Sequence, residues 1–377
     1  MTWETARRLL AVRLDALGDV LMTTPALRAL KAGRPGRHLT LLTSPAGAAA
    51  AALIPEVDAV LVYEAPWMKA TAAPADRAAD YAMIERVRAG GFDGAVVFTV
   101  YSQSPLPAAM LCYLAEVPRR LAHCHENPYQ LLTDWVPDPE PAGGIRHEVR
   151  RQLELVASVG CASPDDRLSL RVPPEARARV ARRLEACGLG GRPWVLIHPG
   201  ASAPSRRYPA EQFAEAARGL AQAGWAVALS GVDGEPALRE VLDALVGVDA
   251  RVLAGLALDE FAALVEAAPL LVSNNSGPVH VAAAVGTPVV DLYALTNPQH
   301  TPWGVPHRIL FHDVPCRYCY KSVCPEGHHD CLRGVAAQEV VSASLELMGP
   351  GPGVPLPMPA SVAAPWAGAA FVAEAAR

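Results

Sequence analysis

A polar run from Ser273 to His280 contains the side chains best suited to chemistry in this sequence. Apolar residues flank it, which predicts a strand, a turn and a short helix. Asn275 or Ser276 can cap that helix, and Gly277 allows a ligand to approach the backbone. The N–H groups and the dipole at a helix N-terminus favour phosphate. The run therefore predicts a diphosphate site with His280 nearby, although a capped helix without a ligand has the same pattern.

A second candidate group, the carboxylate of Asp19, lies near the start of the chain. Residues 8–13 are typical of a strand, Gly18 marks a bend, and residues 19–31 have helical spacing. Open α/β sheets keep reactive groups at the carboxyl ends of their strands, so Asp19 is a candidate base. Its alternative role is a helix N-cap or a first-turn carboxylate, worth about 1 kcal/mol. Because no G-x-G-x-x-G follows the strand, an NAD enzyme is set aside.

Another polar loop contributes small residues, a hydroxyl and cations. It consists of His198 to Ser202 and Arg206 to Pro209, directly after an apolar strand. In chain order, the first loop is Leu17 to Asp19, the second is this one, and the third is the run from Ser273 to His280. We expect the three loops to meet at one cleft. One carboxylate facing a diphosphate site suits sugar transfer from a nucleotide-sugar, because a base can activate the acceptor while cations stabilise the leaving group. Glycoside hydrolysis fits less well, since it usually needs a pair of carboxylates.

Strands alternate with helices along the chain, which predicts parallel, doubly wound α/β sheets. The alternation is interrupted by a Pro- and Asp-containing stretch at 164–174 and restarts at Trp194. With 377 residues, the chain is long enough for about two domains. We predict Rossmann-like domains at residues 1–165 and 166–348, and a disordered Pro-, Gly- and Ala-rich tail at 349–377.

Composition excludes some classes of protein. A net charge of −5 argues against a nucleic-acid binder. The first eight residues lack the apolar stretch of a signal peptide, and no run has the length and strength of a transmembrane helix. We therefore expect a cytoplasmic protein that could lie peripherally at the inner membrane. In that compartment its eight cysteines are expected to be thiols or metal ligands rather than disulfides.

The three loops together resemble a known family. The residues concerned are Leu17-Gly-Asp-Val-Leu21, His198-Pro-Gly-Ala201 with Arg206-Arg-Tyr-Pro209, and the run from Ser273 to His280 with its following Gly-Thr-Pro288. In this order, over about residues 8 to 347, they are similar to the ADP-heptose:lipopolysaccharide heptosyltransferases, glycosyltransferase family nine. The resemblance implies a GT-B fold, an N-terminal acceptor domain, a C-terminal ADP-sugar domain and an inverting, metal-independent transfer.

The resemblance also implies roles for single residues. Asp19 takes the position of the general base, and we place Gly18 and Arg120 on the acceptor side. The positions implied in donor binding are Ser202, Arg206, Glu235, Asn275, Ser276, Gly277 and His280.

Two of these positions depart from the family pattern. Asn275 stands where the family usually has Asp, so any contact with a sugar hydroxyl would come from a neutral amide and not from a carboxylate. Arg206 stands where the family usually has Lys, which keeps the charge and adds a bidentate fork but removes a proton donor. Both differences concern the identity of the donor more than the class of reaction.

The predicted function is inverting transfer of a heptose or related sugar. The donor would be an ADP-sugar, and the acceptor an anionic glycolipid or glycan, such as a lipopolysaccharide core, at the inner face of the membrane. We expect a monomer that needs no cofactor. The alternatives are a transferase with another nucleotide-sugar donor and an inactive nucleotide-sugar-binding protein. Asp19 argues against the inactive protein, which has no need of a carboxylate opposite the donor phosphates.

A cysteine-rich segment near the C-terminus has no role in the predicted transferase site. Its spacing, Cys316-x2-Cys319-x4-Cys324-x6-Cys331, could bind zinc. Only one C-x-x-C pair is present, and the other spacings match no standard zinc module. Reduced, packed thiols are the favoured alternative, so no metal is assigned to the predicted site.

Overall fold

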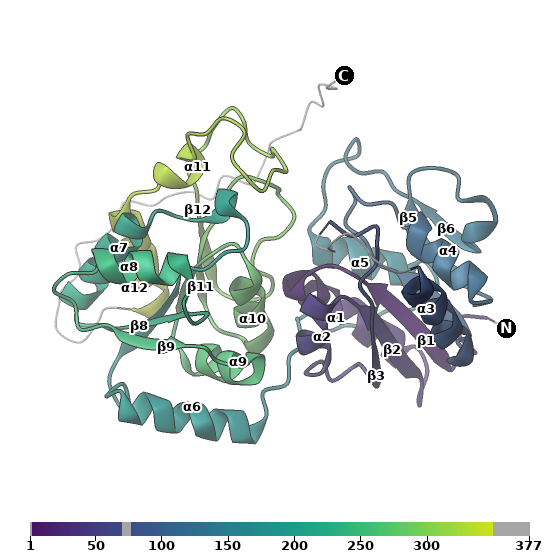
Figure 1. Ribbon diagram of the computed structural model, residues 1–377, viewed down its shortest axis with the longest axis horizontal. Coiled ribbons are helices and arrows are strands. Elements are labelled where there is room, and N and C mark those ends of the chain that lie inside the picture. Colours follow the sequence, from purple (N-terminus) through teal and green to yellow (C-terminus); the bar gives the residue numbers. More distant parts are fainter. Residues whose placement is uncertain (1, 70–76, 350–377) are drawn as a thin grey trace.

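In the computed structural model the chain forms two α/β domains side by side (Figure 1). The structure describes residues 2–69 and 77–349. Apart from Gly349, the predicted tail lies outside the described residues. Each domain contains one six-stranded sheet in which every pairing is parallel, so the predicted pair of doubly wound sheets is confirmed.

The N-terminal sheet has the strand order β3-β2-β1-β4-β5-β6. Its central strand is apolar on both faces because helices cover both: Leu9 and Ala11 face one layer, and Leu10 and Val12 the other. The strands are β1 (Arg8–Arg13), β2 (His38–Thr43), β3 (Ala59–Val62), β4 (Gly94–Val97), β5 (Arg120–Cys124) and β6 (Asp134–Pro137).

The N-terminal helices form two layers around this sheet. Helices α1 (Leu17–Ala32), α2 (Pro45–Ala51) and α5 (Glu148–Ala157) pack together on the layer that faces the second domain. Helices α3 (Ala78–Ala89) and α4 (Leu106–Leu114) pack on the opposite face, beside the short turn η1 (Tyr129–Leu131).

The C-terminal sheet has the order β12-β11-β10-β7-β8-β9. Its strands are β7 (Trp194–His198), β8 (Ala226–Gly231), β9 (Arg251–Ala254), β10 (Leu271–Asn274), β11 (Val289–Leu292) and β12 (His307–Leu310). Helices α6 (Pro174–Ala186), α9 (Leu258–Ala267) and α10 (Gly277–Val285) lie toward the first domain. Helices α7 (Ala210–Gln222), α8 (Pro236–Ala244) and α12 (Ala337–Met348) cover the other face, and η2 (Pro204–Arg206) and α11 (Asp330–Arg333) are short.

The two sheets share one topology, and this determines where a ligand can bind. Counted within its own domain, each sheet reads 3-2-1-4-5-6 or its reverse, so the direction of winding changes beside β1 and beside β7. In open α/β sheets, the crevice at the carboxyl ends of the strands at this switch point is the usual ligand site. Asp19 follows β1, His198 ends β7 and Asn275 follows β10. All three predicted loops therefore lie at the two switch points.

Helices α1 and α10 join the two domains (Figure 1). One apolar cluster runs through both: it contains Leu21 and Leu27 of α1 as well as Val279 and Ala282 of α10. Separate clusters fill the outer layers of the two domains. The shared cluster holds the two switch points against each other, so that their loops can form one crevice.

Two strands, β6 and β12, were not predicted, and both are edge strands. Helix α10 ends at Gly286, which adopts the left-handed conformation at φ +88° that glycine tolerates best. Among the described residues, no helix has the length and apolar character needed to cross a membrane.

Candidate active site

The N-termini of α1 and α10 approach each other closely at the crevice. A Cβ atom on Gly18 would lie 2.5 Å from Cδ2 of His280, closer than real side chains come, and one on Gly277 would lie 3.4 Å from Cδ2 of Leu17. Gly18 was predicted on the acceptor side, and the structure places it directly against the His280 ring. Its missing side chain is what allows the first and third loops to meet.

A buried guanidinium holds three carboxylates together at the end of β1. Arg13 is fully buried, and its Nε lies 2.9 Å from Oδ2 of Asp15. Its Nη2 lies 3.2 Å from Oδ1 of Asp19, and its Nη1 lies 2.8 Å from Oε1 of Glu148 on α5. Unpaired buried charges are costly, so each member of this set requires the others. We call these four residues the base wall.

Burial changes the proton affinity of the base wall. It raises the pKa of Asp15 and of Glu148 above the usual carboxyl range, with the Asp19 charge adding to the effect and Arg13 opposing it. Burial lowers the pKa of Arg13, but its three carboxylate neighbours outweigh burial and raise it overall. Arg13 therefore stays charged, while the two more buried carboxyls hold protons more readily than exposed ones.

Asp19 is the member of the base wall that a substrate can reach. Its side chain is 20% exposed, compared with 11% for Asp15 and 1% for Glu148. Both oxygens of Asp15 are engaged, because Gln103 Nε2 donates to Oδ1 at 2.6 Å and Arg13 faces Oδ2. For Asp19 only Oδ1 has a contact in the described part of the chain, which leaves Oδ2 available to accept a proton.

Of the two structural alternatives for Asp19, the N-cap does not fit and the first-turn carboxylate does. Helix α1 is preceded by Ala16, and no side chain caps it. Asp19 lies inside the first turn, where the helix dipole favours a negative charge. Its carboxylate is in addition held by Arg13, whose Nη2 lies 3.2 Å from Oδ1.

Across the crevice, Arg206 begins a series of polar contacts that reaches Asp19. Nη2 of Arg206 donates to Oδ1 of Asn297 at 3.2 Å, and Thr296 Oγ1 donates to the same oxygen at 2.8 Å. Nδ2 of Asn297 lies 2.6 Å from Nδ1 of His300. Nε2 of His300 lies 3.9 Å from Oδ1 of Asp19. A loop between β11 and β12 thus connects a donor-side cation to the base.

Asn275 is buried, and its side-chain amide is hydrogen-bonded to the loop between β11 and β12. Its Nδ2 donates to Oδ2 of Asp291 at 2.8 Å and to the backbone oxygen of His300 at 2.9 Å. Burial raises the pKa of Asp291 to about 8, although Asn275 and Arg206 act in the opposite direction. Asp291 is therefore mostly neutral at pH 7, next to a neutral amide. Ser276 precedes α10 and donates to the Gly200 oxygen at 3.2 Å, which ties the third loop to the second.

Glu235 lies against the second loop. A Cβ atom on Gly200 would be 2.7 Å from Glu235 Oε1 and 2.9 Å from His198 Nε2, so a larger residue there would displace these two side chains. Oε2 of Glu235 accepts from the Val232 N–H at 3.2 Å. Ser202 is exposed on the loop that follows β7. The structure thus brings Glu235 to the loop and leaves the Ser202 hydroxyl open to solvent.

The histidines on this side of the crevice are neutral. Burial lowers the pKa of His198 to about 4. Burial also lowers the pKa of His280 and His300 well below the usual value, and the positive charge of Arg206 adds to both shifts. At neutral pH the positive charge here is therefore that of Arg206. The residues Arg206, Asn275, His280, Asp291 and His300 are called the donor wall below.

The structure does not bring Arg120 to the other predicted residues. It is the first residue of β5, at the amino end of a parallel strand, whereas the crevice lies at the carboxyl ends. Its Nε and Nη2 donate to the Leu131 and Gln130 oxygens, both at 2.8 Å, and its guanidinium lies over the Tyr113 ring. Arg120 therefore fastens η1 to the sheet.

The cysteine-rich segment shows no metal site. Cys316 Sγ lies 3.6 Å from His328 Nε2, and all eight cysteines are free thiols. Within residues 2–69 and 77–349, no group of three or more His, Cys, Asp or Glu side chains is arranged to hold a metal ion.

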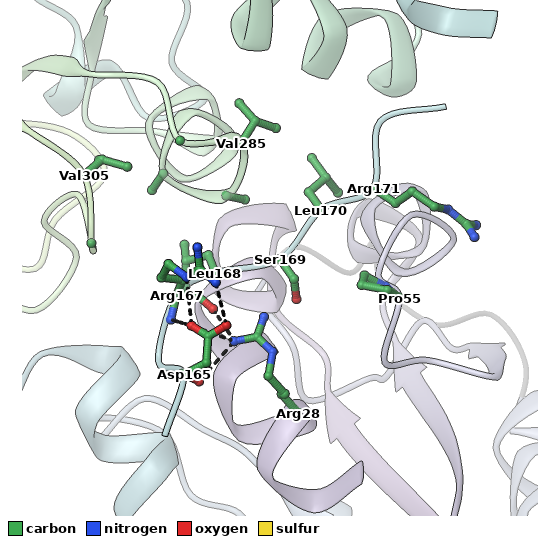
Figure 2. A pocket seen from close by; sticks show the side chains of 14 residues that line it. Arg28, Pro55, Asp165, Arg167, Leu168, Ser169, Leu170, Arg171, Val285 and Val305 are labelled. Carbon is green, nitrogen blue, oxygen red and sulfur yellow. Dashed lines mark hydrogen bonds and ion pairs between the residues drawn. The ribbon is translucent and has the colours of Figure 1, made fainter. Parts of the chain in front are cut away.

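A cavity of about 340 Å³ lies between the interdomain linker and the C-terminal end of α10 (Figure 2). Arg28 of α1 secures the linker there, because its Nη1 donates to the Asp165 and Arg167 oxygens at 3.1 and 2.7 Å. Its Nε contacts Glu56 Oε1 at 3.0 Å. No predicted donor or base residue lines this cavity, so it belongs to the linker and not to the crevice.

Comparison with known proteins decides the family. The sequence pattern of the family described as "Glycosyltransferase family 9 (heptosyltransferase)" matches residues 81–329, which is more than half of the chain. The chain belongs to glycosyltransferase family 9. Among its relatives, lipooligosaccharide heptosyltransferase 2 of Haemophilus influenzae is 30% identical over 210 residues, covering 52% of this chain and 60% of the relative.

Solved structures agree with this family 9 assignment. Escherichia coli ADP-heptose lipopolysaccharide heptosyltransferase II superposes with a TM-score of 0.71 at 24% identity, covering 90% of this chain and 98% of that one. An E. coli heptosyltransferase with ADP-2-deoxy-2-fluoro heptose superposes with a TM-score of 0.64 at 20% identity, covering 90% and 99%. The predicted GT-B fold is confirmed.

Several residues of this family 9 site were missed by reasoning from the sequence. One signal was available: the polar run from Thr296 to His300 follows the apolar strand β11, just as the run from Ser273 follows an apolar segment. An arginine that ends an apolar strand was a second signal. The missed residues are Arg13, Glu148, Asp291, Asn297 and His300.

Proposed function

We propose that this family 9 protein transfers a heptose from ADP-heptose to a lipopolysaccharide core or related envelope glycan. Support comes from family membership and from a relative described as a lipooligosaccharide heptosyltransferase. A fold neighbour crystallised with ADP-2-deoxy-2-fluoro heptose supports an ADP-sugar donor. The enzyme would act in the cytoplasm as a monomer and meet its anionic acceptor at the inner face of the membrane.

One observation carries the proposal. Asp19 presents an oxygen without a partner in the described chain, and across the crevice stands a wall whose charge is the cation Arg206. The N-terminus of α10 opens beside this wall, with Gly18 packed against His280 at the junction. A carboxylate that faces a phosphate-attracting surface is the arrangement that transfer from a nucleotide-sugar requires.

The proposed reaction is a single displacement. Oδ2 of Asp19 accepts the proton of an acceptor hydroxyl, whose oxygen then forms a bond to the anomeric carbon of the heptose. The bond from that carbon to the diphosphate oxygen breaks, and the electron pair leaves with ADP. Because attack and departure occur on opposite faces of the sugar, the anomeric configuration inverts.

The leaving group is stabilised by the donor wall. Arg206 supplies a positive charge and a fork of N–H donors for the diphosphate. Gly277 and the residues after it supply backbone N–H groups and the positive end of the α10 dipole. Ser202 and Glu235 flank this place on the second loop, where a hydroxyl and a carboxylate can bind the nucleoside or the sugar. The proposal assigns no divalent metal to this step.

Donor choice is where a second candidate function has support. Asn275 is a neutral amide whose N–H₂ group is already bonded to Asp291 and to the His300 oxygen. An aspartate at this position would present a charged acceptor to a sugar hydroxyl, whereas here both neighbouring groups are mostly neutral. A different nucleotide-sugar donor is therefore the alternative to test alongside ADP-heptose.

The test is direct assay of transfer. The purified protein is incubated with ADP-heptose, or with ADP- and UDP-hexoses, and with de-acylated lipopolysaccharide cores truncated before each heptose. We expect ADP release and a heptosylated product with inverted anomeric configuration, at a rate unchanged by EDTA. Turnover with only another nucleotide-sugar would support the second candidate. Tight ADP-heptose binding without turnover on any acceptor, or activity lost with EDTA and restored by Mg²⁺, would contradict the proposal.

A further inference from the structure

The loop that carries His300 is held by both domains. In the C-terminal domain, Nδ2 of Asn275 donates to the His300 backbone oxygen at 2.9 Å. In the N-terminal domain, the Glu148 N–H donates to the Gln299 oxygen at 3.0 Å, and His147 Nε2 lies 3.0 Å from the Thr301 oxygen. The His300 ring is thereby fixed between the donor wall and the base wall.

Donor and acceptor chemistry determines which ring nitrogen of His300 carries the proton. A guanidinium can only donate, so Arg206 must face the oxygen of the Asn297 side chain. The Asn297 nitrogen then faces His300 Nδ1, and an amide N–H₂ can only donate. Nδ1 therefore accepts, and in the neutral ring Nε2 must carry the hydrogen.

That Nε2–H points at the base. Nε2 is buried, has no hydrogen-bond partner among the described residues, and lies 3.9 Å from Oδ1 of Asp19. A shift of about 1 Å would bring the two atoms to hydrogen-bond distance. The charged groups around the ring are Arg206, Arg13 and Asp19, and its further titratable neighbours are His147, His280 and Tyr293. Both cations favour the neutral ring that the hydrogen-bond pattern requires.

His300 and Arg13 both lie near the same oxygen of Asp19. Arg13 Nη2 is 3.2 Å from Oδ1, and the His300 Nε2–H approaches Oδ1 from the other domain. Two donors on one oxygen fix the rotation of the carboxylate and leave Oδ2 for the acceptor hydroxyl. Because Asn297 joins His300 to Arg206, a diphosphate on Arg206 would act on the same chain of contacts.

We propose that His300 is a positioning residue that orients the Asp19 carboxylate, and that Asn297 links this orientation to Arg206 and so to the bound donor. The inference rests on the proposed function, because it takes Asp19 as the base. It goes beyond that function by predicting that the base is fully oriented only when the two domains and the Arg206–Asn297 contact are in place.

Two substitutions of His300 distinguish a role in positioning Asp19 from a role in packing. His300→Phe keeps the ring volume but removes both nitrogens, whereas His300→Gln places an amide N–H near the position of Nε2. In the transfer assay, we expect His300→Phe to lower kcat about 10- to 100-fold with little change in the donor KM. His300→Gln should recover most of that loss. His38→Phe, at a half-buried histidine that begins β2 and so lies at the amino end of the sheet, is the control and should keep its rate.

The pH profile gives a readout that packing alone does not change. An N–H donor stabilises the carboxylate form of Asp19, so its loss in His300→Phe should move the acid limb of kcat/KM to higher pH. Equal rates for His300→Phe and wild type, or equally poor rates for His300→Phe and His300→Gln with an unmoved acid limb, would overturn the proposal.

A measurement without substrate keeps the two proposals separate. Long-range ¹H–¹⁵N NMR spectra of the full chain, with His300 assigned from the His300→Gln variant, report the tautomer. We expect Nε2–H at pH 7. An Nδ1–H ring or a charged imidazolium would overturn the proposed positioning role of His300, whatever reaction the protein catalyses. If Asp19→Asn retains full transfer activity, the proposed function fails; if Asp19→Asn is inactive and His300→Phe is unaffected, only the positioning role fails.

Discussion

The base wall of the crevice is charged, whereas the donor wall is almost neutral apart from Arg206. On the base wall, one buried guanidinium is surrounded by three carboxylates. On the donor wall, burial keeps the histidines and Asp291 largely uncharged at neutral pH. The cation of the base wall is thus already paired with carboxylates before any ligand arrives, while the donor wall leaves its one cation for an anionic ligand.

This difference arises from loops and not from the scaffold. Both sheets have the same strand order, and both walls lie at the carboxyl ends of strands beside a switch point. A helix N-terminus opens at each, α1 at the base wall and α10 at the donor wall. What differs is the side chains that follow β1 and β10. The chemistry of this GT-B protein therefore resides in residues placed on two nearly equivalent frames.

The largest expected effect on stability comes from removing the centre of the base wall. Arg13→Met would leave three carboxylates without their counterion, so we expect a loss of about 3–5 kcal/mol in the free energy of unfolding. Urea denaturation measures it. Arg37→Met is the matched control: Arg37 is equally buried in the same domain, but its guanidinium bonds mainly to backbone oxygens. If both variants lose the same stability, charge pairing is not what holds the base wall together.

Removing the cation of the donor wall should affect ligand binding instead. Arg206→Ala should weaken ADP binding by about 1.5–3 kcal/mol, the usual value of a charged hydrogen bond, with a smaller change in stability. Calorimetric titration with ADP measures this loss. Arg182→Ala, at an exposed position on α6, is the control. An Arg206→Ala variant that binds ADP like wild type would remove the second loop from the donor site.

The expected effect that is smallest per step of the experiment, here one pH unit, concerns the buried carboxyl of the donor wall. The pKa of Asp291 is raised to about 8, so between about pH 4 and pH 8 the folded state binds more protons than the unfolded state, and stability falls as pH rises. Asp291→Asn removes this term, so its stability gain over wild type should grow by up to about 1.4 kcal/mol per pH unit. Thermal unfolding at pH 5, 6, 7 and 8 tests it; parallel curves would show that Asp291 is already ionised.

Much of the fold was predictable because both domains have strong periodicity. Strands such as Arg8–Arg13 and Trp194–His198 have the bounds expected from their apolar runs. The two missed strands, β6 and β12, are edge strands whose residues are half-exposed, so they lack an apolar run. Their assignment depends on pairing with β5 and β11, a tertiary fact that no local pattern contains.

The site was predictable only where it is built from continuous motifs. Asp19, Arg206 and the residues from Asn275 to His280 were found because each follows an apolar strand, and the structure gathers them around one crevice. Glu148 and His300 were missed because they reach Arg13 and Asp19, respectively, from elements distant in sequence. Arg120 was placed on the acceptor side, but it is the first residue of β5, at the end of the strand away from the crevice.

The measurement that tests the account most directly is the Asp19→Asn substitution, assayed for transfer and for ADP binding in one preparation. The amide keeps the size of the side chain and can still accept from Arg13, so folding should survive. We expect turnover to fall by about 10²–10⁴-fold, the usual contribution of a positioned base, while ADP affinity stays near that of wild type. Asp15→Asn, whose oxygens are both engaged, is the matched control and should keep more activity. Turnover of Asp19→Asn close to the wild-type rate, or an equal loss in Asp15→Asn, would contradict Asp19 as the base.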